Sequence, residues 1–163
     1  MLYAHFTEKL LGLQDIEIEK IEEIDNSLHI FCHLIKKVHR CSCCSAHTDK
    51  VHDYREQVIK DIPAFGKNVI IHLKKRRYRC SCGKRFPERN SFLPRYQRIT
   101  NRLTAFVIDK LRTEVSFSDV AREANLSVSK VISIFDLVSY SPKKLPTALS
   151  IDEFKGNTNG EKY

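Results

Sequence analysis

The sequence predicts an α+β protein, in which an N-terminal β-hairpin and a cysteine-bearing ribbon precede a helical region. Three observations support this fold class: β-type apolar runs before residue 80, cysteines in two close groups, and apolar residues at helical spacing after residue 100. We expect four parts, which are residues 1–38, 39–92, 98–140 and 141–163.

The composition indicates a folded protein of a reducing compartment. The 163 residues are 42% hydrophobic and 29% charged, as in ordinary globular proteins. No apolar run is long enough for a transmembrane helix, and the first 13 residues lack the pattern of a secretory signal. We therefore expect a cytoplasmic protein without membrane association, whose six cysteines are metal ligands or reduced thiols rather than disulfides.

The charge is distributed unevenly. The net charge is +8, yet residues 1–31 carry seven acids against two lysines. Residues 67–102 carry twelve Lys and Arg against one acid, Glu88. This asymmetry favours a polyanionic partner such as nucleic acid, with a merely solvated basic face as the alternative.

The first part is expected to be a β-hairpin. Two β-like runs, 16–21 and 28–35, flank residues 25–27, whose Asp-Asn-Ser sequence favours a turn. The isoleucines of the first run also fit helical spacing, so that run is ambiguous. Cys32 lies in the second run and is expected in the core; no histidine stands out that would make a nucleophile of a cysteine.

Two cysteine groups predict a zinc ribbon with four cysteine ligands. Cys41 and Cys44 form a C-x2-C pair, and Cys80 and Cys82 form a tighter C-x-C pair. Tetrahedral zinc is bound by four such donors arriving as two pairs. Cys43, His39 or His47 remain alternative ligands.

Strands over 51–62 and 67–79, joined by 63–66, are expected to connect the two cysteine groups. Two such strands alone bury little apolar surface. Zinc would therefore supply much of the folding free energy, roughly 10 kcal/mol or more in structural sites. We expect its removal to unfold residues 39–90 and to leave the helical region folded.

The helical region predicts a helix-turn-helix. A first helix, capped by Thr100 or Asn101, is followed by two helices over 116–135 that meet at Ala121 and turn at Asn125. An ordinary helical hairpin is the alternative. Ser127 would cap the last helix. The apolar positions expected in the core are Leu103, Phe106, Val107, Leu111, Val120, Ala124, Leu126, Val131 and Ile134.

DNA contacts are expected from two places. The last helix would enter the major groove, and the basic strand with its cysteine turn would contact phosphates. The residues concerned are Lys74, Lys75, Arg76, Arg77, Arg79, Lys84 and Arg85 on the ribbon, and Ser127, Ser129, Lys130 and Ser133 on the helix.

The C-terminal part has few features. A linker with two prolines, 141–148, precedes a strand-like segment that carries Asp152 and Glu153. Two-metal nucleotidyl transfer needs about three carboxylates. We expect residues 141–163 to be poorly packed, because one strand has no sheet to join.

In this order of parts, and in the sequences of 76–86 and 150–154, residues 10–163 resemble the bacterial insertion-sequence transposases of the ISL-three family. The resemblance implies that a zinc ribbon and a helix-turn-helix bind the terminal inverted repeats of the element. It also implies that Cys41, Cys44, Cys80 and Cys82 bind zinc and that Asp152 is the first carboxylate of an Asp-Asp-Glu triad.

The other two acids of that triad have no counterpart, since the sequence ends eleven residues after Asp152. The resemblance therefore implies the DNA-binding part of a truncated transposase that is not itself an enzyme. Mg²⁺ would be needed only by a full-length relative. The expected partner is double-stranded DNA, a homodimer stays open, and a zinc-dependent helix-turn-helix transcriptional regulator is the alternative function.

Overall fold

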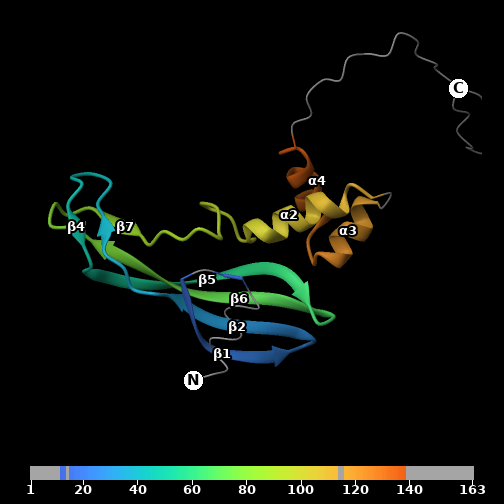
Figure 1. Cartoon of the computed structure of the whole chain (residues 1–163), viewed down its shortest axis with the longest axis horizontal. Coiled ribbons are helices and arrows are strands. Elements are labelled where there is room, and N and C mark those ends of the chain that lie inside the picture. The colour runs from blue at the N-terminus through green and yellow to red at the C-terminus, as the bar shows by residue number, and fades with distance from the viewer. Residues whose placement is uncertain (1–11, 14, 114–115, 139–163) are drawn as a thin grey trace, which may run out of the picture.

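A computed structural model of the chain describes residues 12–13, 15–113 and 116–138. Within these residues it contains a five-stranded sheet, a two-stranded sheet and three helices (Figure 1). The coarse α+β prediction is confirmed. The linker 141–148, the strand-like segment with Asp152, and the expected poor packing of 141–163 lie outside the described residues.

The N-terminal hairpin is confirmed. Strands β1 (Ile16–Ile24) and β2 (Ser27–Leu34) pair antiparallel, with one register shift between Ile18 and Lys20. Asp25 and Asn26 form the turn with φ angles of 47° and 59°, and two left-handed residues match the twist of the flanking strands. The helical interpretation of the first run is therefore wrong.

The two ribbon strands form a second, longer hairpin. Strands β5 (Val51–Ala64) and β6 (Lys67–Arg79) are joined by Phe65 and Gly66, which have φ angles of 55° and 71°. The turn is shorter than the expected 63–66. A register shift between Asp61 and Ala64 accommodates Pro63 at the end of the strand, where a proline is tolerated.

The two hairpins share one sheet, in the order β1-β2-β6-β5. Strand β2 runs parallel to β6, which places Ile30 opposite Ile71 and Cys32 opposite Leu73 on a common buried face. The hairpin is thus not a unit separate from the ribbon, in contrast to the boundary expected at residue 38. The reason is that β5 pairs with only one edge of β6, and β2 pairs with the edge that stays free.

Cys32 belongs to this core, as predicted, and is 1% exposed. Burial raises the pKa of its thiol to about 12, and the nearby Glu19 adds to the effect. The thiol is therefore protonated and acts as an apolar packing group.

Short strands surround the cysteine turns. Strands β3 (His39–Arg40) and β4 (His47–Thr48) pair with each other, and β7 (Arg85–Pro87) pairs with the end of β6. Strand β2 pairs with residues 68–74 of β6, and β7 pairs with residues 77–79 along the same edge. The ribbon end is therefore an extension of the main sheet.

The three helices are α2 (Asn101–Lys110), α3 (Phe117–Glu123) and α4 (Val128–Phe135). Side chains of Thr100, Ser116 and Ser127 accept the N-terminal hydrogen bonds, so the predicted caps of α2 and α4 are confirmed. Asn125 turns between α3 and α4 with φ 51°, as expected. The buried residues are Ile99, Leu103, Val107, Val120, Ala121, Ala124, Val131 and Ile134.

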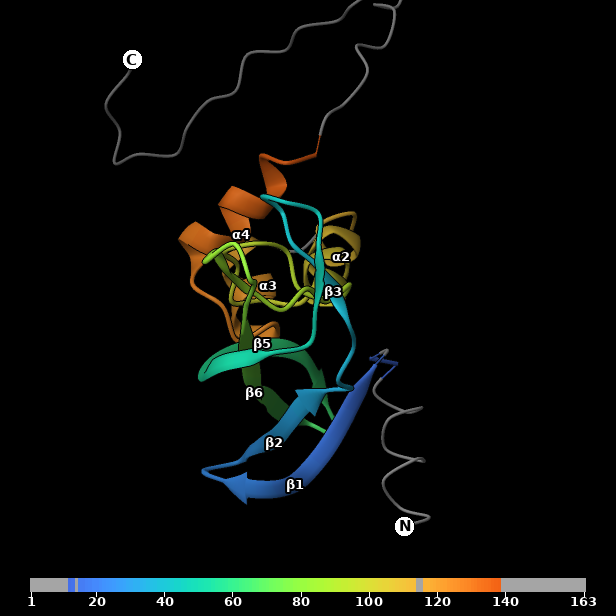
Figure 2. The same ribbon diagram turned by 90° about the vertical axis from the view of Figure 1, so that its left-hand side faces the viewer.

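The helices are fastened to the free edge of β5 (Figure 2). Ile99 bridges Lys60 on β5, and the Lys60 ammonium donates to the Asn125 carbonyl over 2.6 Å. The Asp61 carboxylate, 2% exposed, accepts from the Thr100 hydroxyl over 2.6 Å and from both the Nε and Nη2 atoms of Arg102. One buried acid thus joins the sheet to the start of α2.

No helix of the described residues is long and apolar enough to cross a membrane.

Candidate metal centre and nucleic-acid interface

Four cysteine sulfurs meet at the end of the ribbon. The Sγ atoms of Cys41 and Cys82 are 3.7 Å apart, those of Cys44 and Cys80 are 3.4 Å apart, and all four lie within 4.8 Å of one another. A tetrahedral zinc ion with Zn–S bonds of about 2.3 Å separates its sulfurs by about 3.8 Å. The donor set therefore fits zinc in both chemistry and spacing.

The three residues named as alternative zinc ligands do not belong to the sulfur cluster. Cys43 is exposed, and its backbone N–H points to the Cys41 sulfur over 3.4 Å. His39 lies against the Tyr78 ring, with centroids 4.5 Å apart and the ring planes tilted by 40°, and burial lowers the pKa of His39. His47 lies on β4 with an exposed side chain. Among the described residues, the four-cysteine group is the only cluster of three or more potential ligands that converges in this way.

Tight backbone turns bring each cysteine pair together. Ser45, with φ 60°, donates its N–H to the Cys41 carbonyl, and Gly83, with φ 83°, donates its N–H to the Cys80 carbonyl. The second turn explains how the short C-x-C spacing suffices: Cys82 and Gly83 complete a loop that returns to β7. Gly83 supplies a left-handed conformation that other residues rarely adopt.

Negative charge on one of the four sulfurs disfavours negative charge on its neighbours. The backbone N–H of Cys82 and the neighbouring thiols lower the pKa of Cys80 to about 6. The Lys84 N–H lowers the pKa of Cys82, but the other three thiols and burial outweigh it and raise that pKa to about 12. One negative charge thus suppresses the next, a conflict that a divalent cation would remove.

Arg76 is not available for DNA, and its prediction as a contact residue is corrected. It is 9% exposed; its guanidinium donates to the Glu88 carboxylate over 3.0 Å and to the Leu34 carbonyl over 2.5 Å. Glu88 also receives the Arg76 backbone N–H and the Tyr78 hydroxyl. The Arg76–Glu88 pair therefore lies buried at the position on β6 where the pairing with β2 ends and the pairing with β7 begins.

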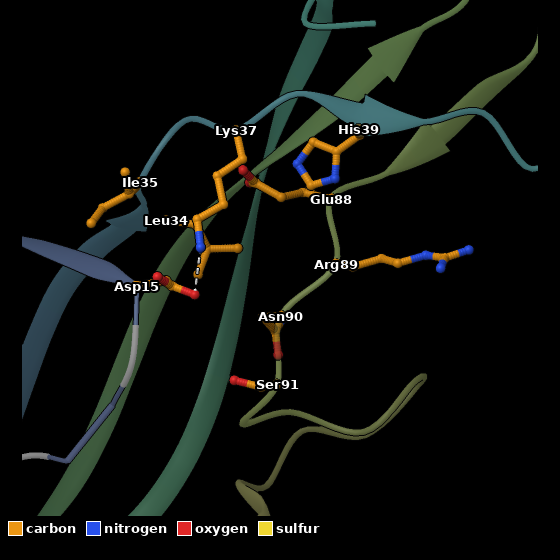
Figure 3. Close-up of a pocket in the computed structure, with 9 residues that line it drawn as sticks. All are labelled: Asp15, Leu34, Ile35, Lys37, His39, Glu88, Arg89, Asn90 and Ser91. Carbon is orange, nitrogen blue, oxygen red and sulfur yellow. Dashed lines mark ion pairs between the residues drawn. The ribbon is translucent and has the colours of Figure 1, made fainter. Parts of the chain in front are cut away.

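A small cavity of about 40 Å³ lies next to this junction (Figure 3). Glu88 and His39 border it on the ribbon side, and the Lys37–Asp15 ion pair, 2.7 Å long, borders it on the hairpin side. The volume is enough for water but not for a substrate or cofactor.

The other basic residues predicted to contact DNA from the ribbon differ in their surroundings. Arg77 pairs with Asp53 over 2.9 Å, burial lowers the pKa of the half-buried Lys75, and Lys74 lies over the Tyr54 ring. The remaining three, Arg79, Lys84 and Arg85, are exposed around the cysteine turns and have no acidic partner among the described residues.

On α4, Ser129 and Ser133 are exposed, whereas Ser127 is engaged as the cap. Lys130 is half-buried, and its ammonium donates to the Gln97 side chain over 2.9 Å. Gln97 belongs to the connecting segment between β7 and α2, a basic segment in which no contact residue was predicted. The run Arg95-Tyr96-Gln97-Arg98 was the available signal.

The fold and the site define the class of the protein as a four-cysteine ribbon joined to a capped three-helix unit. Two family models match: the zinc-finger of transposase IS204/IS1001/IS1096/IS1165 over residues 37–83, and the helix-turn-helix domain of transposase family ISL3 over residues 88–139. The chain carries the zinc-ribbon and helix-turn-helix domains of the ISL3 family of transposases.

A curated relative agrees with this assignment. The chain is 35% identical over 107 residues to the transposase for insertion sequence element IS1001 of Bordetella parapertussis. The match covers 63% of this chain and 26% of the relative, so the chain spans about a quarter of that protein. No solved structure matches the chain.

Proposed function

We propose that the chain recognises the terminal inverted repeats of an insertion sequence and acts as the DNA-binding portion of its transposase. The observation that carries the proposal is that one chain matches both transposase modules, the zinc-finger and the helix-turn-helix domain, and that hydrogen bonds join the helices to strand β5 of the ribbon. In this proposal, residues 39–92 and 98–140 are the binding units, and α4 enters the major groove with Ser129 and Ser133 towards the bases.

Zinc has a structural role in the proposal. Cys41, Cys44, Cys80 and Cys82 hold the ion, and the ion holds the turns that present Lys84 and Arg85. These two side chains, together with Arg79, neutralise phosphates and position the ribbon on the duplex. DNA cleavage with Mg²⁺ on acids beginning at Asp152 belongs to a full-length relative. A homodimer would allow the two ends of an element to be bound together.

The attachment of α2 to β5 supports a single composite site. Asp61 and Lys60 tie the helices to the strand that leads from the cysteine end. A duplex that contacts both modules would therefore meet them at a fixed spacing, which adds to specificity by excluding ends with another spacing.

Binding of the zinc-loaded chain to end sequences tests the proposal. Fluorescent duplexes that tile the flanks of the gene are compared with scrambled duplexes at 150 mM salt. We expect one terminal repeat to be bound at least about 10³-fold more tightly than scrambled DNA. Equal affinities for all duplexes would refute end recognition.

The ribbon contacts are tested by salt dependence. Lys84→Ala with Arg85→Ala should reduce the slope of log affinity against log salt by about 2, because each lost phosphate contact removes about 0.9. Lys20→Ala is a control from β1, at the sheet edge opposite the helices, and its lysine is already paired with Glu22. An unchanged slope in the double variant would exclude the cysteine turns from the interface.

A further inference from the structure

The connecting segment between the ribbon and the helices contains an exposed basic turn beside α4. The turn comprises residues 94–98 and is closed by a hydrogen bond from the Gln97 N–H to the Pro94 carbonyl. Arg95 and Arg98 are exposed, and neither has an acidic partner in the described part of the chain. We propose that this turn is a third DNA-contacting element, which binds the phosphate backbone next to the groove that α4 enters.

The turn is held firmly in place. The Gln97 side chain accepts from Lys130 on α4, and the Gln97 carbonyl accepts from the Gln57 side chain on β5 over 3.0 Å. The Arg98 carbonyl accepts from the Lys60 N–H over 2.9 Å. Anchors from the sheet and from the helix therefore fix the backbone of the turn while its arginine side chains stay in solvent.

The position of the anchor on α4 indicates the partner. Lys130 lies in the first turn of α4, next to Ser129, and the N-terminal residues of a recognition helix are those that contact base edges. A basic turn at this end of the helix lies where the phosphates bordering the groove would pass. This inference rests on the proposed binding of DNA by α4.

Tyr96 is the most unusual residue of the turn. It is 85% exposed and adopts a φ angle of 65°, which is rare for a bulky side chain. The Arg95 guanidinium lies over its ring, 4.8 Å from the centroid. An exposed aromatic ring in a strained conformation contributes little to the fold, whereas a ring that orients an arginine is well suited to phosphate and sugar contacts.

The arginines of the turn lack carboxylate partners in the described residues, whereas several lysines elsewhere have one. Lys20 pairs with Glu22, Lys67 with Glu23 and Lys110 with Glu123. Within the described residues, exposed arginines and lysines without a salt bridge lie in the 89–98 segment and around the cysteine turns, and on the main sheet at Arg55 and Lys74. This distribution is expected where phosphates, and not side-chain carboxylates, are the counter-ions.

Salt-dependent binding of the full zinc-loaded chain tests the inference. Arg95→Ala and Arg98→Ala should each reduce the slope of log affinity against log salt by about 0.9, and together by about 1.8, on end and scrambled duplexes alike. Lys20→Ala, the matched single-charge control, should leave the slope unchanged. Thermal unfolding should be unaffected in all four proteins, since both arginine side chains are exposed.

Tyr96→Asn separates binding from stability, because Asn tolerates the left-handed conformation. We expect equal or higher thermal stability and weaker DNA binding. Ser129→Tyr places a bulky side chain on the face of α4 that is proposed to enter the groove, so its hydroxyl-radical footprint should lose the protection that α4 gives. The footprints of the arginine variants should lose protection at backbone positions next to these.

The outcomes separate the two proposals. Wild-type slopes in the arginine variants would overturn the third contact, even if end recognition holds. Failure of the wild-type chain to distinguish end DNA from scrambled DNA would overturn the proposed function alone, because the slope is measured on either duplex. A chain that binds neither duplex would overturn both.

Discussion

The cysteine end of the ribbon and the three-helix segment are stabilised by different forces. Between Cys41 and Lys50, only Cys41 and Thr48 are buried, and the exposed residues include Cys44. Helices α2–α4 surround a contiguous apolar cluster that includes Leu103, Val107 and Val131. Metal binding therefore stabilises the cysteine end, and apolar burial stabilises the helices. The short, turn-rich cysteine end buries too little apolar surface to be stable by itself.

The main sheet lies between these two regions and limits how far the influence of the metal extends. β5 and β6 are held by β2 and by apolar side chains such as Ile59, Ile71 and Leu73, all of which are fully buried. From the sequence, zinc removal was expected to unfold all of residues 39–90. The structure limits the expected unfolding to the cysteine turns and strands β3, β4 and β7.

Zinc removal should give the largest effect. Chelation, or Cys80→Ser, removes a contribution of about 10 kcal/mol to the local fold. Amide exchange at residues 39–50 and 79–88 should rise to nearly unprotected rates, while β6 up to Leu73 and α2–α4 keep their protection. Hydrogen-exchange mass spectrometry measures this directly.

Cys43→Ser is the control for that experiment, because Cys43 is exposed and does not belong to the sulfur cluster. It should retain about one zinc per chain and wild-type exchange. Loss of protection in the helices at the same rate as in the cysteine turns would show that the comparison between the two regions is wrong.

Substitution of Asp61 tests the helical region, because it removes the hydrogen bonds that join the helices to the sheet. Asp61→Ala leaves the Thr100 hydroxyl and the Arg102 guanidinium without their acceptor. We expect a loss of about 2–4 kcal/mol in the free energy of unfolding, towards the low end because Arg102 is one-third exposed.

Urea denaturation provides the measurement for Asp61→Ala. Asp109→Ala is the matched control, since its exposed carboxylate lies 3.9 Å from Arg112 and should be worth less than about 0.5 kcal/mol. A small effect at Asp61, equal to that at Asp109, would mean that the helices are held by apolar contacts alone.

Local patterns in the sequence were sufficient for the helices and hairpins. Thr100 and Ser127 cap where they were expected to, because capping depends on a few neighbouring residues. Asn125 marked the turn for the same reason. The four cysteines could be grouped because chelation imposes its own spacing.

Contacts between distant segments could not be predicted in this way. The parallel pairing of β2 with β6 depends on which strand edge remains free after both hairpins have formed. Burial of Arg76 follows from Glu88, twelve residues later in the sequence, and charge counting alone treats all arginines of a basic run as equivalent. Long-range partners, rather than residue type, decided which positive charges reach solvent.

Ser127 should give the smallest effect and sharpens the comparison within the helical region. Its side chain accepts the Lys130 N–H over 3.3 Å, so Ser127→Ala should cost about 1 kcal/mol of stability. Ser127→Asp should keep the cap, because Asp is as good an N-cap as Ser and its charge favours the helix dipole. The same carboxylate would repel phosphates at the proposed interface. We therefore expect Ser127→Asp to melt like the wild type while binding end DNA at least about tenfold more weakly at low salt, whereas wild-type affinity in this variant would place the N-terminus of α4 away from DNA.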